Sequence, residues 1–192
     1  MSLQPTNNKK KRNFLTWLFR YLGTKYLKMN YPILWKLNKK ISLATQLRTD
    51  LHSSGSYMQV TNYGVGGTCD AHIDPKGIME MKHVEPEMHV TGDVVGTFMG
   101  WLDDTEAGGG TAYIYPGIEN VLLPEKGAAA FFKNLYSSGH IDFHSYHGGC
   151  PVLKGSKWIL NKWLCMYDNF KKFPCQLSPK MRFIPTSHEN YY

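Results

Sequence analysis

The feature that most constrains the fold of this chain is a change in residue pattern after Ser53-Ser54-Gly55. From this point the chain consists of short apolar and aromatic runs separated by turn signals, among them YGVGG, EAGGG, YPG and PEKG. The pattern predicts seven strands, over residues 57–63, 94–102, 111–115, 119–123, 128–135, 141–146 and 158–167. Short strands in such number, with helical periodicity only before them, indicate a β-sandwich or a barrel-like jelly roll.

The N-terminal part has helical periodicity instead. After Pro32, apolar residues recur at helical spacing, as at Leu37 and Ile41, and proline is common in a first helical turn. We therefore expect a helix over residues 32–51, packed on the outside of the domain, and a second, less regular one over residues 14–27. The predicted fold class is mainly β with N-terminal helices.

Length and charge limit the number of domains and the kinds of partner. With 192 residues, 42% of them hydrophobic, the chain is long enough for one substantial core. We place the folded domain over residues 31–178, between a basic, partly disordered arm (1–30) and a C-terminal tail (179–192).

The charge is distributed unevenly along the chain. Residues 1–50 carry 11 Lys and Arg against one acid (+10), whereas the remaining 142 residues carry 11 against 14 (−3). The folded part therefore lacks the charge of a nucleic-acid-binding groove, and we expect no nucleic-acid partner.

Neither a targeting segment nor a membrane segment is evident. No run approaches the ~18 apolar residues of a membrane helix, so we expect no transmembrane segment. The basic residues 9–12 precede an apolar run that Arg20 interrupts, and no small-residue cleavage site follows; we do not expect a cleaved signal peptide. Four cysteines without a CxxC pair suggest neither a disulfide scaffold nor a zinc site, and they leave the redox compartment open.

One tripeptide, His-Ile-Asp, occurs twice, at residues 72–74 and 140–142. Positions i and i+2 of a strand point to the same face, so the imidazole and the carboxylate can hold one metal ion while a remote third ligand completes a 2-His-1-carboxylate site for Fe(II). The first copy follows a glycine-rich turn and has remote histidines downstream. The second copy has further histidines only in its own predicted strand. Three ligands from one straight strand cannot take the facial arrangement around a metal ion that such a site needs. We therefore favour His72 and Asp74, and expect the second copy on the surface.

The third ligand has three candidates, His140, His144 and His147. His147 is favoured because it precedes Gly148-Gly149, where backbone can approach a ligand closely, and because Lys157 follows on the next predicted strand. A buried lysine requires an anion, and the distal carboxylate of 2-oxoglutarate is such a partner. The alternative is an ordinary surface lysine.

The motifs around these residues resemble a known family. Residues 58–175 are similar to the catalytic domain of the collagen prolyl 4-hydroxylase α subunit, within the Fe(II)/2-oxoglutarate-dependent dioxygenases. The resemblance is carried, in order, by MQVTNYGVGG, AHID, EAGGGTAYIYPG, LPEKGAAAFFKNL, HGGCPVLKGSKWILNKW and FPC, and it covers 118 of 192 residues. It implies a double-stranded β-helix, a jelly roll that holds iron in its mouth, and makes residues 31–178 a dioxygenase catalytic domain.

The resemblance also implies roles for individual residues. It makes three residues the Fe(II) ligands, namely His72, Asp74 and His147. It places Lys157 against the C5 carboxylate of 2-oxoglutarate, with hydroxyl groups from Tyr63 and Thr111 around the same co-substrate. Without the resemblance, Tyr63 would be an ordinary strand aromatic and Thr111 a hydroxyl at a strand start. The remaining co-substrate is O2, and L-ascorbate would rescue oxidised iron.

Two positions depart from the family pattern, and both bear on the substrate. Cys69 replaces a tyrosine that contacts the substrate proline in the family, and Val94 replaces an arginine at the start of its strand. A third substrate contact is kept as Trp163. Aromatic and cationic side chains supply much of the binding energy at such surfaces. We therefore expect oxygen activation to be kept, and proline hydroxylation to be weakened or redirected.

The implied function is hydroxylation of peptidyl-proline, as in procollagen-proline 4-dioxygenases, with decarboxylation of 2-oxoglutarate coupled to C–H hydroxylation. The expected partner is a proline-containing peptide or protein. Assembly with protein disulfide isomerase is doubtful, because 192 residues leave no room for the dimerisation and peptide-binding domains of the collagen enzymes, and the chain is a candidate truncated form. The resemblance points to the endoplasmic reticulum lumen and to a disulfide between Cys150 and Cys175. In a reducing compartment both would be thiols.

Two other functions compete with this one. The first is a non-catalytic jelly-roll binding protein descended from such an enzyme, which the changes at Cys69 and Val94 favour. The second is an oxygenase that uses its basic arm to act on nucleic acid, which the slightly acidic folded part disfavours. The complete set of His72, Asp74, His147 and Lys157 argues for an enzyme over a binding protein.

Overall fold

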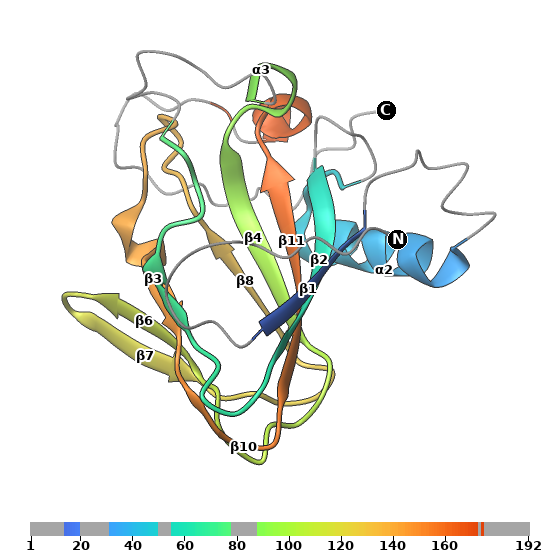
Figure 1. Ribbon diagram of the computed structural model, residues 1–192. Coiled ribbons are helices and arrows are strands. Elements are labelled where there is room, and N and C mark those ends of the chain that lie inside the picture. Colours follow the sequence, from blue (N-terminus) through green and yellow to red (C-terminus); the bar gives the residue numbers. More distant parts are fainter. Residues whose placement is uncertain (1–13, 20–30, 50–54, 78–87, 173, 175–192) are drawn as a thin grey trace.

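Two antiparallel β-sheets face each other in the computed structural model, which describes residues 14–19, 31–49, 55–77, 88–172 and 174 (Figure 1). The larger sheet has the order β1 (Phe14–Phe19), β2 (Gly55–Tyr63), β11 (Lys157–Cys165), β4 (Val94–Trp101) and β8 (Ala129–Lys133). The smaller sheet has the order β3 (Cys69–His72), β9 (His147–Gly149), β6 (Thr111–Tyr115) and β7 (Ile118–Leu122). A short ribbon of β5 (Ala107–Gly108) and β10 (Val152–Lys154) lies at one end. The mainly β prediction is confirmed.

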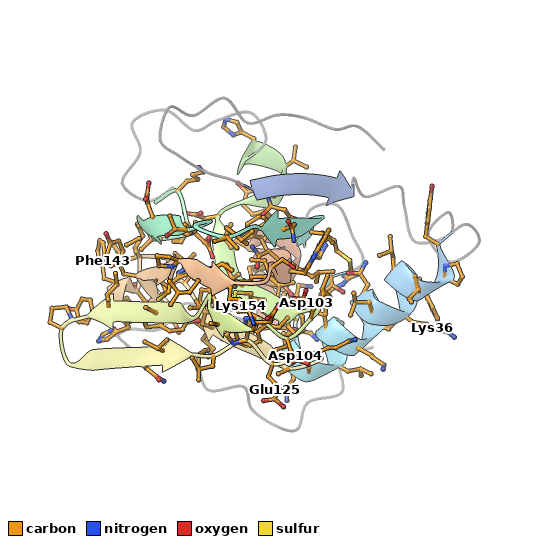
Figure 2. All side chains as sticks on the ribbon, turned by 60° about the horizontal axis from the view of Figure 1, so that its bottom comes forward. Lys36, Asp103, Asp104, Glu125, Phe143 and Lys154 are labelled. Atoms are coloured by element: carbon orange, nitrogen blue, oxygen red, sulfur yellow. The ribbon has the colours of Figure 1, made fainter. Side chains whose placement is uncertain are left out.

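Helix α2 (Pro32–Thr45) packs on the outer face of the larger sheet, and the exposed Lys36 on this helix points away from the sheet (Figure 2). Ile41 forms a buried cluster there with Met58 of β2 and Leu160 of β11. The helix begins at Pro32 as predicted but ends at Thr45, not at residue 51, because Gln46 adopts a left-handed conformation with φ of 59°. None of the helices in the described part of the chain is long and apolar enough to cross a membrane.

The helix predicted over residues 14–27 is wrong for its first part. Residues 14–19 form β1, which pairs along its full length with β2, from Phe14 opposite Tyr63 to Phe19 opposite Met58. A weak helical pattern gives way here to the hydrogen bonds that an open sheet edge offers to an aromatic-rich segment. Residues 20–27 lie outside the described part of the chain.

The strand predicted over residues 141–146 is also wrong. Ile141 makes only an isolated bridge to Leu135, and a short 3-10 helix, η1 (Phe143–Ser145), follows. Asp142 causes this turn, because its side chain accepts a hydrogen bond from the His144 amide at the helix start. The strand that carries the histidine begins only at His147.

The inner face of the larger sheet meets the smaller sheet in a second core. Tyr63, Met99, Trp101 and Ile159 of the larger sheet are buried there with Val152 of β10. Strand β11 lies at the centre of the larger sheet and sends alternate side chains to each face. Those that point inward begin with Lys157, and they line a cavity between the sheets.

Two further helical segments close the end of the sheets at which β4 begins. These are α3 (Met88–Thr91) and the 3-10 helix η2 (Tyr167–Lys172), which contact each other. Asn169 of η2 donates a hydrogen bond to the carbonyl of Arg48 and accepts one from its amide, and so ties the chain after α2 to the end of β11. These contacts hold the outer layer in place, and none of the residues that make them lines the cavity between the sheets.

Candidate active site

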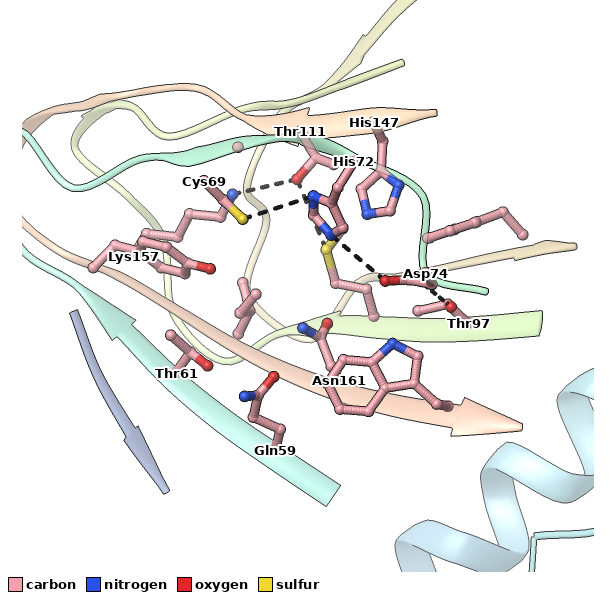
Figure 3. Close-up of a pocket in the computed structure, with 16 residues that line it drawn as sticks. Gln59, Thr61, Cys69, His72, Asp74, Thr97, Thr111, His147, Lys157 and Asn161 are labelled. Carbon is pink, nitrogen blue, oxygen red and sulfur yellow. Dashed lines mark hydrogen bonds and ion pairs between the residues drawn. The ribbon is translucent and has the colours of Figure 1, made fainter. Parts of the chain in front are cut away.

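A cavity of about 190 Å³ lies between the two sheets and gathers most of the predicted site residues (Figure 3). Eight residues singled out in the sequence line it: Tyr63, Cys69, His72, Asp74, Thr111, His147, Lys157 and Trp163. Val94 is not among the residues that line this cavity; it begins β4 and pairs with Cys165. These eight residues come from five different strands and one loop.

The three proposed metal ligands meet at one end of the cavity. His72 ends β3, His147 begins β9, and the two residues are direct partners in the antiparallel pair. Asp74 lies two residues beyond His72, in a bend after the strand rather than in the strand itself. One ligand atom from each of the three residues lies within 4.8 Å of the others. No other group of three or more His, Cys, Asp or Glu residues in the described part of the chain could hold a metal ion.

Both imidazoles are held by backbone carbonyls. His147 Nδ1 lies 2.7 Å from the Ser145 carbonyl, and His72 Nδ1 lies 2.8 Å from the Asp70 carbonyl. A carbonyl only accepts hydrogen bonds, so each Nδ1 carries the proton whenever the ring is neutral. The Nε2 lone pair of each ring then remains available for a metal ion, with its direction set by the second hydrogen bond.

Asp74 is oriented from the opposite side. The Thr97 hydroxyl donates a hydrogen bond of 2.6 Å to Asp74 Oδ2, and the Asn134 amide donates one of 2.8 Å to the Thr97 oxygen. Asn134 and Thr97 are both fully buried. These two hydrogen bonds fix the Asp74 carboxylate so that its second oxygen, Oδ1, lies 3.5 Å from His72 Nε2.

Proton affinities in this cluster fit a site that exchanges protons for a metal ion. The carboxylate of Asp74, with a smaller effect from Cys69, raises the pKa of His72 to about 10. Burial opposes the ionisation of Asp74, but hydrogen bonds from His72 and Thr97 outweigh it, and the pKa of Asp74 falls below its usual value. Burial lowers the pKa of His147. A metal ion bound at this cluster would therefore displace a proton chiefly from His72.

Replacing Thr97 by valine is expected to weaken metal binding by roughly 10- to 100-fold. Valine keeps the shape of threonine but cannot hold Asp74 Oδ2, and it leaves the Asn134 amide without its acceptor. Titration of the metal-free protein with Fe(II) under anaerobic conditions measures the change. Thr97→Ser, which keeps the hydroxyl, is the matched control, and equal affinities for Thr97→Val and wild type would contradict this role.

The other end of the cavity is built around Lys157. Its ammonium lies 3.2 Å from the Thr111 hydroxyl, 3.5 Å from the Gly110 carbonyl and 5.7 Å from the centre of the Tyr63 ring. Lys157 is only 3% exposed and has no carboxylate partner among the described residues. Burial lowers the pKa of Lys157 to about 8, partly offset by Cys150 and Cys69. A buried cation without a counter-ion is suited to bind an anion from outside.

The remaining histidines of the region lie elsewhere. His144 contacts Asp142 and Tyr136 and packs against the Tyr115 ring, and none of these residues lines the cavity. His140 is exposed and contacts Ser138. The surface position expected for the second His-Ile-Asp is thus correct for His140 and wrong for Asp142, which is buried because it caps η1.

The cysteines divide between the cavity and its surroundings. Cys69 lines the cavity, and its sulfur lies 3.9 Å from His72 Nδ1. Cys150 lies just after β9 and forms no disulfide with a described cysteine. Cys175 lies outside the described residues, so its pairing with Cys150 stays a prediction.

The comparison with protein families decides the identity of the domain. The family model described as the 2OG-Fe(II) oxygenase superfamily matches residues 58–165, which contain all three candidate metal ligands and Lys157. The chain belongs to this superfamily. It is therefore an oxygenase domain of the class that uses Fe(II), 2-oxoglutarate and O2.

Curated relatives of this oxygenase are subunits of prolyl 4-hydroxylases. The chain is 38% identical over 155 residues to prolyl 4-hydroxylase subunit alpha-3 of Homo sapiens, which covers 78% of this chain and 26% of the relative. The chain is 35% identical over 153 residues to human subunit alpha-1, which covers 77% of this chain and 26% of the relative. It is 33% identical over 144 residues to subunit alpha-2 of Gallus gallus, which covers 75% of this chain and 25% of the relative. The chain thus spans about a quarter of the length of these relatives.

Solved structures support the fold of the oxygenase. The viral collagen prolyl hydroxylase of Paramecium Bursaria Chlorella virus-1, in its 2OG complex, matches with a TM-score of 0.62 and 22% identity over 80% of each chain. A prolyl hydroxylase of Trichoplax adhaerens, in complex with a hypoxia inducible factor peptide, matches with a TM-score of 0.55 and 14% identity, over 86% of this chain and 69% of the other. The jelly roll expected from the sequence is confirmed.

The cavity of the oxygenase fits both an Fe(II) ion and 2-oxoglutarate. Two neutral imidazole nitrogens and one carboxylate are a donor set suited to Fe(II) with open positions, and their hydrogen bonds direct them to a common point. The buried Lys157 is suited to be the positive end for a dicarboxylate that would reach toward this point. Thr97 and Asn134 orient Asp74, and were not singled out in the sequence. Nor were Gln59 and Asn161, which line the cavity.

Proposed function

We propose that this oxygenase hydroxylates prolyl residues of a peptide or protein substrate. The observation that carries the proposal is a single cavity with a facial metal-ligand set at one end and a buried lysine at the other. This lysine forms no ion pair with a carboxylate among the described residues. The substrate class is supported by similarity to prolyl 4-hydroxylase α subunits over more than three quarters of the chain. In this proposal His72, Asp74 and His147 hold Fe(II).

The second group of residues binds the co-substrate. Lys157 pairs with the C5 carboxylate of 2-oxoglutarate, and the Thr111 hydroxyl, already 3.2 Å from the ammonium, donates to the same carboxylate. Tyr63 closes the pocket beside Lys157, its partner in the β2–β11 register. When bound, Fe(II) and 2-oxoglutarate supply the chemistry, in which decarboxylation of 2-oxoglutarate by O2 is coupled to hydroxylation of a C–H bond. The protein orients these groups and keeps water from the reacting centre.

The substrate occupies the open side of the cavity. Trp163 lines it on the inner face of β11 and offers an apolar surface to a proline ring. Cys69 lines it opposite Gly149, and a small thiol there leaves space that a larger side chain would fill. We propose that Cys69 makes this cavity wider beside the metal and thereby alters substrate preference. Val94, at the start of β4, remains a predicted contact for a longer substrate.

The wider biological setting also belongs to the proposal. The relatives suggest the endoplasmic reticulum lumen, where a disulfide between Cys150 and Cys175 is favoured, and L-ascorbate as the reductant that restores oxidised iron.

The test is to load the protein with Fe(II) and 2-oxoglutarate without oxygen, and then to add O2 and a proline-rich peptide. We expect a weak visible charge-transfer band for the anaerobic complex, then succinate together with a peptide carrying one added oxygen on proline. The same peptide with alanine for proline is the control. Cys69→Tyr is expected to increase hydroxylation of the proline peptide. Peptide binding without the band or succinate would instead support a non-catalytic binding protein.

A further inference from the structure

Two amide side chains stand next to each other on the floor of the cavity. Gln59 of β2 and Asn161 of β11 are direct partners in the antiparallel register, and both line the cavity (Figure 3). Side chains on the same face at such a position have Cβ atoms about 4.5–5.5 Å apart. Together they present two carbonyl oxygens and two NH2 groups to one place.

Neither amide group has a hydrogen-bond partner within the described part of the protein. No hydrogen bond joins the Gln59 or the Asn161 side chain to another described residue. Both side chains are half-buried. By contrast, the side-chain NH2 group of Asn134 donates to Thr97, and that of Asn169 donates to the carbonyls of Arg48 and Cys165. Amide groups that face a cavity readily exchange water for a ligand that forms hydrogen bonds. Two adjacent, unengaged amides that face a cavity are therefore suited to a ligand that can both donate and accept.

The position of the pair separates it from the anion-binding end. The inner face of β11 carries Lys157, Ile159, Asn161 and Trp163 in order. Four residues along a strand span about 13 Å between Cα atoms, so the amides stand well away from the Lys157 end and next to Trp163. Across the sheet, Trp163 pairs with Thr97, which holds Asp74. The amides thus flank the metal site on the side of β2, where a substrate that rests on Trp163 would continue.

We propose that Gln59 and Asn161 bind one peptide group of the substrate. One side-chain NH2 donates to the peptide carbonyl, and one side-chain carbonyl accepts from the peptide N–H. Both side chains are neutral, so they favour a main-chain amide over a carboxylate or an ammonium group, and this selects a residue inside a peptide over the free amino acid. The inference rests on the proposed function and adds specificity-determining residues to it.

The inference is tested with apolar variants of similar shape, Gln59→Met and Asn161→Leu, alone and combined. Each single variant is expected to raise the KM for a proline-rich peptide roughly tenfold, the usual effect of losing a hydrogen bond from a ligand amide. The Kd of 2-oxoglutarate, measured from the anaerobic charge-transfer band, should change less than twofold. Asn62→Leu is the matched control, because Asn62 lies on β2 between the inward-facing Thr61 and Tyr63 and does not line the cavity.

A second set of substrates removes the N–H from the ligand instead. Peptides N-methylated at single amides around the target residue are compared with the parent peptide. At the amide that the pair recognises, methylation should raise the wild-type KM roughly tenfold and have little effect in the double variant, because the accepting carbonyl is already gone.

The outcomes separate this inference from the proposed function. If the wild type hydroxylates the peptide but both variants keep its KM within twofold, the amide inference is wrong and the proposed function stands. If the variants weaken 2-oxoglutarate binding and not peptide binding, the amides serve the co-substrate and the inference is overturned. If the wild type consumes 2-oxoglutarate but hydroxylates no peptide, the proposed function and this inference fall together.

Discussion

Replacing His147 by alanine is expected to abolish succinate production and to leave the protein unable to retain stoichiometric Fe(II). His147 supplies one of the three ligand atoms that lie within 4.8 Å of one another, and its Nε2 is the one directed into the site by the Ser145 carbonyl. Loss of a partner that only orients a metal ligand weakens binding by about 10- to 100-fold, so loss of the ligand itself should exceed that. Iron content after gel filtration and succinate release measure the two effects.

The controls for this variant come from the histidines that the sequence left as alternatives. His144 contacts Asp142 and Tyr136, and His140 contacts Ser138, both outside the cavity. Alanine at either position should leave iron content and turnover near wild type. The assignment is wrong if His144→Ala or His140→Ala loses iron while His147→Ala keeps it.

The candidate metal ligands could be singled out in the sequence because the spacing of two of them follows from local geometry. His72 and Asp74 are two residues apart, and the glycines after His147 mark the close approach of β9 to β3, where a Cβ at Gly148 would lie 3.2 Å from Ala71. The expectation that His72 and Asp74 lie in one strand was too simple. Asp74 reaches the site from a bend beyond β3, and a hydrogen bond from Thr97, 23 residues further along the chain, holds it there. Spacing and the family resemblance indicated the candidate ligands, but not the residues that orient them.

Other elements depended on contacts that one sequence does not reveal. Phe14–Phe19 has aromatic and β-branched residues in a short run that fits either a helix or a strand, and the open edge of β2 decides for the strand. Asp142 was grouped with His140 by tripeptide identity, whereas the structure uses its carboxylate to cap η1. Asn161 was predictable in part, since strand alternation from Lys157 places it inward, but its cross-strand partner Gln59 follows only from the sheet order.

Replacing Lys157 by methionine is expected to raise the Kd of 2-oxoglutarate by roughly a hundredfold or more. Removing one partner of a buried, hydrogen-bonded charge pair costs about 2–5 kcal/mol of binding free energy. Methionine keeps the length of the side chain and removes the ammonium that Thr111 and Gly110 now hold. The anaerobic charge-transfer titration measures Kd, and iron content reports whether the metal end is intact. An unchanged Kd with normal iron content would exclude Lys157 as the carboxylate partner.

The pH dependence of the same Kd distinguishes a charge effect from a loss of packing. Burial lowers the pKa of Lys157 to about 8 in the ligand-free protein, so the lysine is charged below this pH and neutral above it. Because the charged form binds the C5 carboxylate, the Kd of 2-oxoglutarate should be nearly constant below pH 8 and rise about tenfold per pH unit above it. Arginine keeps its charge over this range, so Lys157→Arg should bind with a Kd that stays flat to pH 9.5, even if its larger head weakens binding overall. A flat wild-type profile, or an equal rise in Lys157→Arg, would mean that Lys157 does not titrate in the binding step.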